Sequence, residues 1–437
     1  MTTYSTQEVE MYLLDFGSEA LKIFKKCPHV GDVAFLDDIE KISRFFDMIQ
    51  KEIKNRKAIL SDYNGDYNLY LKTNKNTMPM IIVVINNYEA FSEGFNDKYD
   101  DILLSITREG IKCGIVFIVT ASSYNSIRYR LNQNFKQKIA LQLNNDDDYF
   151  NIFDDVGKKR PSHLFGRGLI SLGPGQVYEF QTAKICEPEQ WSLHISSKIE
   201  EVQKINKKIA KSIPVLPHRV LIEDIEDELS DLTKVPLGIK KKELTVYTYN
   251  FTKNVVNIIT AKNLEEVSQF TSYIIEELRL LKNINLMILD FEKAILNKKT
   301  TQGDFKNCIE QIKNNSSNNI CIVIGIDKLI SDVQNGEQSL LEMIKIADES
   351  ESCNFIFVDN SSRLKNHEYD EWYKSYVSGD TGIWVGNGID DQYLIKTNTI
   401  GKDIVNKCGI SFGYVVNQGE ATMIKLLGIK EDGDKNE

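Results

Sequence analysis

Residues 81–87 read Ile-Ile-Val-Val-Ile-Asn-Asn, and residues 320–326 read Ile-Cys-Ile-Val-Ile-Gly-Ile. Each begins with an uninterrupted apolar run, mostly β-branched, which is typical of a strand buried on both faces of a parallel sheet. Similar runs follow at 115–119 and 354–358, and both pairs of runs are 239 residues apart. We therefore interpret the chain as two copies of one fold.

Further matches in the same order support this interpretation. Residues 12–16, Tyr-Leu-Leu-Asp-Phe, correspond to residues 287–291, Met-Ile-Leu-Asp-Phe, and a glycine-rich strand pair at 168–180 corresponds to one at 412–424. Between the strands, apolar residues recur at helical spacing, at 39–53 and at 264–281. The sequence thus predicts an α/β fold in two tandem domains with mainly parallel sheets.

We predict domains at 1–205 and 241–430, a polar tail at 431–437, and a connector at 206–240 that is marked by prolines and an acidic run.

Composition restricts the function. The 437 residues are 42% hydrophobic and 27% charged, as in folded proteins, and the net charge of −10 argues against general nucleic-acid binding. No apolar run reaches the roughly 18 residues of a spanning helix, and the start lacks the features of a signal peptide, so we expect the chain alone to be cytosolic. The seven cysteines are scattered without a C-x-x-C pair, which suggests neither a disulfide framework nor a metal site.

The phosphate-binding pattern G-x-x-x-x-G-K-[ST] is not found, because neither Gly157-Lys158 nor Gly401-Lys402 has the required flanking residues. In the second copy its place between strand and helix is taken by Ala261-Lys262-Asn263. Without glycine the backbone does not readily form a nest of N–H groups around a phosphate, so Lys262 and Asn263 are weak candidates for nucleotide contact. In the first copy we expect the N-terminal strand, P-loop and helix to be missing, because too few residues precede the strand that ends at Asp15.

The acidic pair that handles magnesium and water in nucleotide hydrolysis is also replaced. The first copy has Asn86-Asn87 at these positions, and the second has Gly325-Ile326 followed by Asp327. Because an amide carries no charge and accepts no proton, we predict that hydrolysis is lost in both copies. Asp327 is an alternative metal ligand if the strand end shifts, or otherwise a surface acid or helix cap.

These motifs, together with Pro28–Val33, the helix reaching Glu52–Leu60 and Arg108–Gly114, follow one another in an order that resembles the FtsK/SpoIIIE ATPase domains. Within that family the order is similar to the tandem domains of type VII secretion ATPases of the EssC/YukB group. The resemblance implies RecA-like (P-loop NTPase-like) domains, with ATP and Mg²⁺ as cofactors in the family. Because the motifs are altered, we expect this chain itself to bind neither. It also implies that Arg56 reaches a neighbouring subunit, for which an i, i+4 surface pair with Glu52 is the alternative, and that Ser122 lies near a sensor position.

The resemblance further implies partners. They are WXG100/Esx-type secretion substrates, an upstream motor domain and other membrane components, in a homo-oligomer such as a hexamer at the cytoplasmic face of the membrane. The last domain of such proteins receives a substrate's C-terminal signal, and Trp372, Tyr376 and Trp384 are candidates for that pocket, with core packing as the alternative.

Three functions remain open. The first is a non-hydrolysing module for docking and regulation. The second is an active ATPase that uses a P-loop from another chain or an unusual site around Lys262 and Asp327. The third is a fragment of a DNA translocase, which fits the acidic balance least well.

Overall fold

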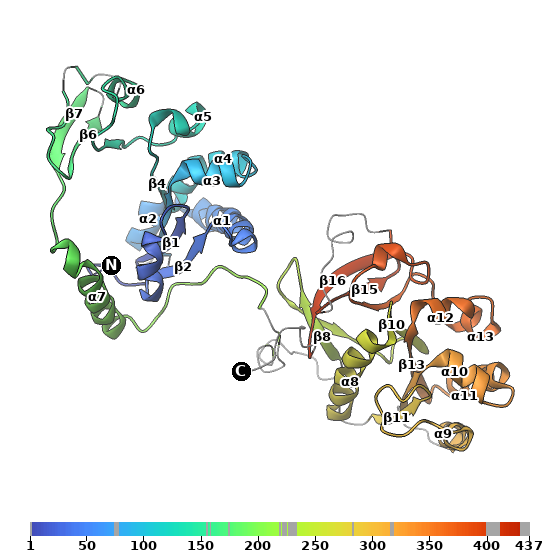
Figure 1. Cartoon of the computed structure of the whole chain (residues 1–437). Helices are drawn as coiled ribbons and strands as arrows, with labels where there is room; N and C mark the ends of the chain where they lie inside the picture. The colour runs from blue at the N-terminus through green and yellow to red at the C-terminus, as the bar shows by residue number, and fades with distance from the viewer. Residues whose placement is uncertain are drawn as a thin grey trace. The chain divides into compact units, whose positions relative to one another are not determined.

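The computed structural model describes residues 2–73, 78–153, 156–157, 159–173, 175–217, 220, 225, 234–281, 284–314, 319–398 and 411–428. The chain divides into two compact units, Met1–Val215 and Leu216–Glu437 (Figure 1). Lys158, Gly401-Lys402, most of the acidic connector and the tail 431–437 lie outside the described residues. None of the described helices is both long and apolar enough to cross a membrane.

The first unit is built on a four-stranded parallel sheet in the order β2-β1-β3-β4. Its strands are β1 (Val9–Asp15), β2 (Val30–Phe35), β3 (Met80–Asn86) and β4 (Ile115–Val119). A separate antiparallel sheet consists of β5 (Ile139–Ala140), β6 (Arg167–Gly173) and β7 (Gln176–Gln181). The apolar runs at 81–85 and 115–119 thus form neighbouring strands, as predicted.

Alternate side chains of the main sheet enter two separate cores. One core contains apolar residues of α1, α2, α3 and α4, and the other contains residues of η1 and α7. The helices of this unit are α1 (Ile39–Leu60), α2 (Tyr67–Thr73), α3 (Tyr88–Gly94), α4 (Asp100–Gly110), α5 (Tyr129–Asn132), α6 (Asp148–Ile152) and α7 (Trp191–Ile205), with 3-10 turns η1 (Ala20–Lys26), η2 (Ser61–Tyr63), η3 (Ile111–Cys113), η4 (Tyr124–Ser126) and η5 (Pro188–Gln190).

The second unit has one nine-stranded sheet in the order β11-β12-β13-β10-β14-β15-β16-β8-β9. Strands β11 to β14 in this order are parallel, and the remaining pairs are antiparallel, so the sheet is mixed. The strands are β8 (Val235–Lys240), β9 (Val246–Tyr249), β10 (Val256–Ala261), β11 (Asn285–Asp290), β12 (Asn319–Ile324), β13 (Cys353–Asn360), β14 (Gly382–Val385), β15 (Phe412–Asn417) and β16 (Glu420–Leu426). Since β8 pairs with β16, the last six residues of the predicted connector are part of this sheet.

Helix α8 (Leu264–Leu280) packs on one face of this sheet, and the other helices pack on the opposite face (Figure 1). These are α9 (Gln302–Asn314), α10 (Ile326–Asp332), α11 (Gly336–Glu349), α12 (Ser361–Asn366) and α13 (Glu371–Tyr376), with a 3-10 turn η8 (Ile389–Asp391). The first unit has no counterpart of β10 and α8 among its described elements.

The internal repeat is present in both topology and hydrogen bonding, but its register differs from the prediction by one residue. The Ile81 N–H donates to the Gly114 carbonyl, and the Asn319 N–H donates to the Ser352 carbonyl. The donor and the acceptor of the second bond each lie 238 residues after those of the first. The neighbouring strands agree, since the Phe16 N–H donates to the Asn86 carbonyl and the matching Phe291 N–H donates to the Ile324 carbonyl, and these two carbonyls are again 238 residues apart. The predicted offset of 239 was therefore wrong, because runs of similar β-branched residues do not fix their own register.

Candidate nucleotide site

The carboxyl end of β1 carries a buried aspartate. Asp15 is 1% exposed, and its carboxylate accepts the backbone N–H groups of Gly17 at 3.1 Å and Leu21 at 2.9 Å. A third hydrogen bond, of 2.8 Å, comes from the Asn86 side-chain amide. The carboxylate thus organises the loop after β1.

Asn86 and Asn87, at the positions of the acidic pair, are likewise occupied by protein groups. The Asn86 Oδ1 accepts the Thr120 hydroxyl at 2.8 Å. Asn87 is in the left-handed region with φ 64°, caps α3 by accepting the Ala90 N–H, and donates its amide to the Phe16 carbonyl. The two amides therefore connect three strand ends.

A carboxylate does lie near these amides, two residues further along. Glu89 Oε1 accepts the Ser122 N–H at 2.5 Å and the Ser122 hydroxyl at 2.6 Å. Burial alone would raise the pKa of Glu89, but hydrogen bonds from Ser122, Ser126 and the backbone outweigh it and lower the pKa to about 2. The hydroxyl of Ser122, which was predicted to lie near a sensor position, therefore donates to Glu89.

The second unit has very little room for phosphate. Strand β10 ends at Ala261 and α8 begins at Leu264, so only Lys262 and Asn263 separate them. Lys262 pairs with Asp391 at 2.9 Å, and the Asp391 carboxylate raises the pKa of Lys262. The first turn of α8 carries Glu265 and Glu266, which oppose an anion at this helix end.

At the carboxyl ends of the neighbouring strands β11 and β13, charged side chains bind protein groups. Asp290 is fully buried and accepts four backbone N–H groups at 2.8–3.1 Å, in the same manner as Asp15. Arg363 donates to Glu292 at 2.7 Å and lies 3.5 Å from the buried Asp359. Burial raises the pKa of Asp359, against the attraction of Arg363.

The corrected register changes the counterparts of the acidic pair. Asn87 and Gly325 both precede a seven-residue helix and both have a positive φ, so Ile324-Gly325 takes the place of Asn86-Asn87. Asp327 then corresponds to Glu89. Its carboxylate lies 3.3 Å from His367, whose other ring nitrogen lies 2.7 Å from Asp370.

These residues do not fit Mg-ATP. Each described acid at these strand ends is bound by backbone, amide, serine or basic side chains, although Oε2 of Glu89 is buried without a hydrogen-bond partner, and the β10–α8 turn offers no nest of amides. Among the described residues, no group of three or more His, Cys, Asp or Glu side chains is placed to hold a metal ion.

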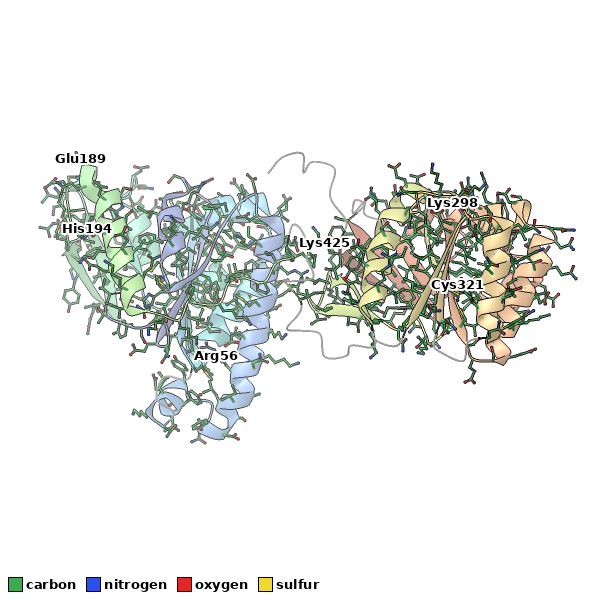
Figure 2. The ribbon with its side chains drawn as sticks, turned by 90° about the horizontal axis from the view of Figure 1, so that it is seen from below. Arg56, Glu189, His194, Lys298, Cys321 and Lys425 are labelled. Atoms are coloured by element: carbon green, nitrogen blue, oxygen red, sulfur yellow. The ribbon has the colours of Figure 1, made fainter. Side chains whose placement is uncertain are left out.

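Arg56 forms the i, i+4 pair with Glu52 that was the alternative prediction, but it does so in the interior and not at the surface. It is 2% exposed, donates to Glu52 at 2.7 Å and to the Cys113 carbonyl at 3.0 Å, and lies among the side chains inside the first unit (Figure 2). The i, i+4 pair exists, but its guanidinium is buried. In this structure the Arg56 guanidinium joins α1 to the segment before β4.

The three aromatic candidates for peptide docking differ in their surroundings. Trp372 and Trp384 are both fully buried in the core of the second unit, so core packing accounts for them. Tyr376 alone lines a cavity of about 900 Å³, at the amino end of β10, which Tyr247, Tyr249 and Asn254 also line.

Two groups of functional interest escaped the sequence analysis. Asp15 and Asp290 were used there only to align the two copies. A repeated aspartate at the end of a buried strand could have indicated a carboxylate that accepts hydrogen bonds from the following loop. Glu89 was overlooked because its proximity to Ser122 arises from the pairing of β3 with β4.

Residues 1–167 match the model of the FtsK/SpoIIIE family. The type VII secretion system protein EssC of Staphylococcus aureus strain MRSA252 is 25% identical over 371 residues, which are 82% of this chain and 24% of that protein. The chain thus spans about a quarter of the length of this curated relative.

Two solved structures have a similar fold. EssC ATPases 2 and 3 of Geobacillus thermodenitrificans match with a TM-score of 0.81 at 19% identity, covering 98% of this chain and 86% of the other. Thermomonospora curvata EccC ATPases 2 and 3, in complex with a signal sequence peptide, match with a TM-score of 0.55 at 16% identity, covering 98% and 84%. The chain therefore resembles the FtsK/SpoIIIE-type ATPases, and it has the fold of the tandem ATPase domains 2 and 3 of type VII secretion EssC proteins.

Proposed function

We propose that this chain is an ATPase-like module of a type VII secretion motor that binds and regulates without hydrolysing ATP. The observation that carries the proposal is the two-residue β10–α8 turn, which lacks glycine and is flanked by Glu265 and Glu266. A phosphate there would meet like charges and few backbone donors. In the first unit, Asn86 and Asn87 add no charge to hold magnesium.

Isothermal titration of the full chain with ATP and MgCl₂ tests this proposal. We expect no heat of specific binding. Micromolar affinity that is lost in Lys262→Ala would instead place a nucleotide in the second unit and contradict the proposal. The same result would favour the active ATPase, the second of the three functions.

We further propose that the second unit docks the C-terminal tail of a WXG100/Esx-type substrate. A related protein, Thermomonospora curvata EccC, was solved with a signal sequence peptide, which supports a peptide-binding role. The cavity beside Tyr376 is large enough for several side chains and offers both tyrosine rings and amides as contacts.

Fluorescence anisotropy with a labelled tail peptide from a cognate substrate tests the docking site. Tyr376→Ala should weaken binding about tenfold or more, as for an interface anchor. Tyr369→Ala is a matched control, because Tyr369 is 74% exposed and does not line the cavity. Equal affinity of the Tyr376 variant and the wild type would exclude this cavity.

The remaining partners follow from the same proposal. They are an upstream motor domain, other membrane components of the secretion system and further copies in a homo-oligomer at the cytoplasmic face of the membrane. A DNA translocase is disfavoured, because the chain carries a net charge of −10.

A further inference from the structure

Two cysteines lie in contact in the core of the second unit. Cys308 on α9 and Cys321 on β12 are free thiols, and their Sγ atoms are 3.7 Å apart. Met287 of β11, the parallel partner of Cys321, places its Sδ atom 3.7 Å from the Cys308 Sγ. Since a disulfide bond is about 2.05 Å long, the two Sγ atoms need to approach by about 1.7 Å to form one, a movement of the size that side-chain rotation supplies.

The two thiols differ in their access to solvent. Cys321 belongs to a strand of which all six residues are buried, and it lies inside the second unit (Figure 2). Cys308 lies on a helix that buries only Phe305, Cys308 and Ile312. Because local opening is easiest where few apolar side chains are buried, an oxidant should reach Cys308 before it reaches Cys321.

The two thiols also differ in acidity. A hydrogen bond from Cys321 lowers the pKa of Cys308, although burial raises it. The same hydrogen bond and complete burial raise the pKa of Cys321. Because the thiolate is the form that reacts with an oxidant, Cys308 is the better nucleophile of the two, and Cys321 is placed to react second.

We propose that Cys308 and Cys321 are an oxidative modification site, at which hydrogen peroxide converts the two thiols to a disulfide. The Cys308 thiolate attacks one peroxide oxygen, the O–O bond breaks, and Cys308 becomes a sulfenic acid while hydroxide leaves. The Cys321 sulfur then attacks the Cys308 sulfur, and the sulfenic hydroxyl group leaves as water with the Cys321 proton. The two thiols together lose two electrons and two protons, and the peroxide is reduced to two molecules of water.

The disulfide ties α9 to the sheet of the second unit. It closes a loop that runs from residue 308 to residue 321, and such a closed loop stabilises the folded unit by restricting the unfolded chain. The modification does not depend on nucleotide binding or substrate docking, because neither Cys308 nor Cys321 lines the cavity beside Tyr376. Cys353 of β13, which is buried in the same core, is the competing partner for either thiol.

Peptide mapping of the full chain tests the proposal. The folded protein is treated with hydrogen peroxide, its remaining thiols are blocked with N-ethylmaleimide in urea, and it is digested with trypsin without reduction. Trypsin releases three separate peptides that carry Cys308, Cys321 and Cys353, namely 307–313, 314–328 and 346–363. We expect the first two to be joined by a disulfide that dithiothreitol removes.

Unfolding provides a second measurement. Closing a loop of this length should raise the urea midpoint of the second unit by about 1 M in the oxidised chain, and dithiothreitol should reverse the shift. Cys308→Ser should abolish both the link and the peroxide-induced shift. Cys186→Ser, at a partly exposed free thiol of the first unit, is the control and should keep both.

The peptide map of the wild type decides the outcome even where a variant folds poorly. Cys308 and Cys321 that are both still blocked by N-ethylmaleimide after peroxide treatment would overturn the proposal. Oxidation of Cys308 to a sulfinic acid without a link to Cys321, or a link from either thiol to Cys353, would overturn it as well.

Discussion

The buried aspartates at the strand ends provide the sharpest test of the site's chemistry. If Asp290 builds the loop after β11 and holds no ligand, then Asp290→Asn should damage folding. The substitution keeps the size of the side chain and one oxygen, but it replaces the other oxygen with an NH₂ group.

The magnitude follows from the hydrogen bonds. Asp290 Oδ2 accepts the N–H groups of Ile295 and Leu296 at 2.8 Å each, and Oδ1 accepts two others at 3.1 Å. In the variant, the new NH₂ group is itself a donor and faces two backbone N–H donors. Each hydrogen bond to a charged group contributes about 1.5–3 kcal/mol, so we expect the free energy of unfolding of the second unit to fall by about 3–5 kcal/mol.

Urea unfolding followed by tryptophan fluorescence measures this loss. The chain has three tryptophans, and Trp372 and Trp384 are buried in the second unit. A Trp191→Phe background removes the signal of the first unit. With a urea slope of about 2–3 kcal/mol/M, the unfolding midpoint should fall by about 1–2 M.

Asp391→Asn is the control, because Asp391 is 78% exposed and makes a single surface pair with Lys262, so the midpoint should not move measurably. A midpoint of Asp290→Asn within about 0.3 M of the parent, equal to less than about 1 kcal/mol, would refute the structural role. The carboxylate would then be available for another task, such as a metal.

Three further predictions follow from the placement of single side chains. Arg56→Ala should destabilise the first unit by about 2–4 kcal/mol, seen as faster hydrogen exchange in β1 to β4, because the buried guanidinium joins α1 to the segment before β4; an arginine that acts on a neighbour would leave exchange unchanged. Trp384→Ala should cost about 3–5 kcal/mol in urea unfolding through the cavity that it creates, whereas a docking residue would change only peptide affinity. Glu89→Gln should destabilise the first unit at neutral pH but less at pH 3. The folded pKa of Glu89 is about 2, below its ordinary value of 4.5, so its charge stabilises the folded state fully above pH 4.5. This stabilisation is lost as the pH falls toward 2. A difference between this variant and the wild type that stays constant with pH in urea unfolding would show that the charge of Glu89 contributes nothing.

The fold was largely predictable because buried parallel strands are continuous apolar runs. Residues 81–85 and 320–324 identified β3 and β12 by composition alone. The departure of residues 261–263 from the phosphate-loop pattern was equally visible, since the pattern needs glycines and a lysine at fixed spacing. The alignment of the two copies failed by one residue, because only hydrogen-bond register separates 238 from 239.

The site was less predictable, because its contacts join residues distant in sequence. Burial of Arg56 depends on the Cys113 carbonyl, 57 residues away. The roles of the aromatic residues at 372–384 were also ambiguous, because aromatic side chains of a core and of a pocket have the same chemistry. Only packing separated the buried Trp384 from Tyr376, which lines a cavity.

By itself, then, the sequence determined two α/β copies and the departure of the second copy from the phosphate-binding pattern, since both depend on residue type and local spacing. The tertiary structure alone decided which carboxylates are buried acceptors, which arginine is inside, and that Trp384 is a core residue whereas Tyr376 lines a cavity. Those properties depend on which strands become neighbours, and neighbours in a parallel sheet are separated by long crossovers that local sequence does not encode.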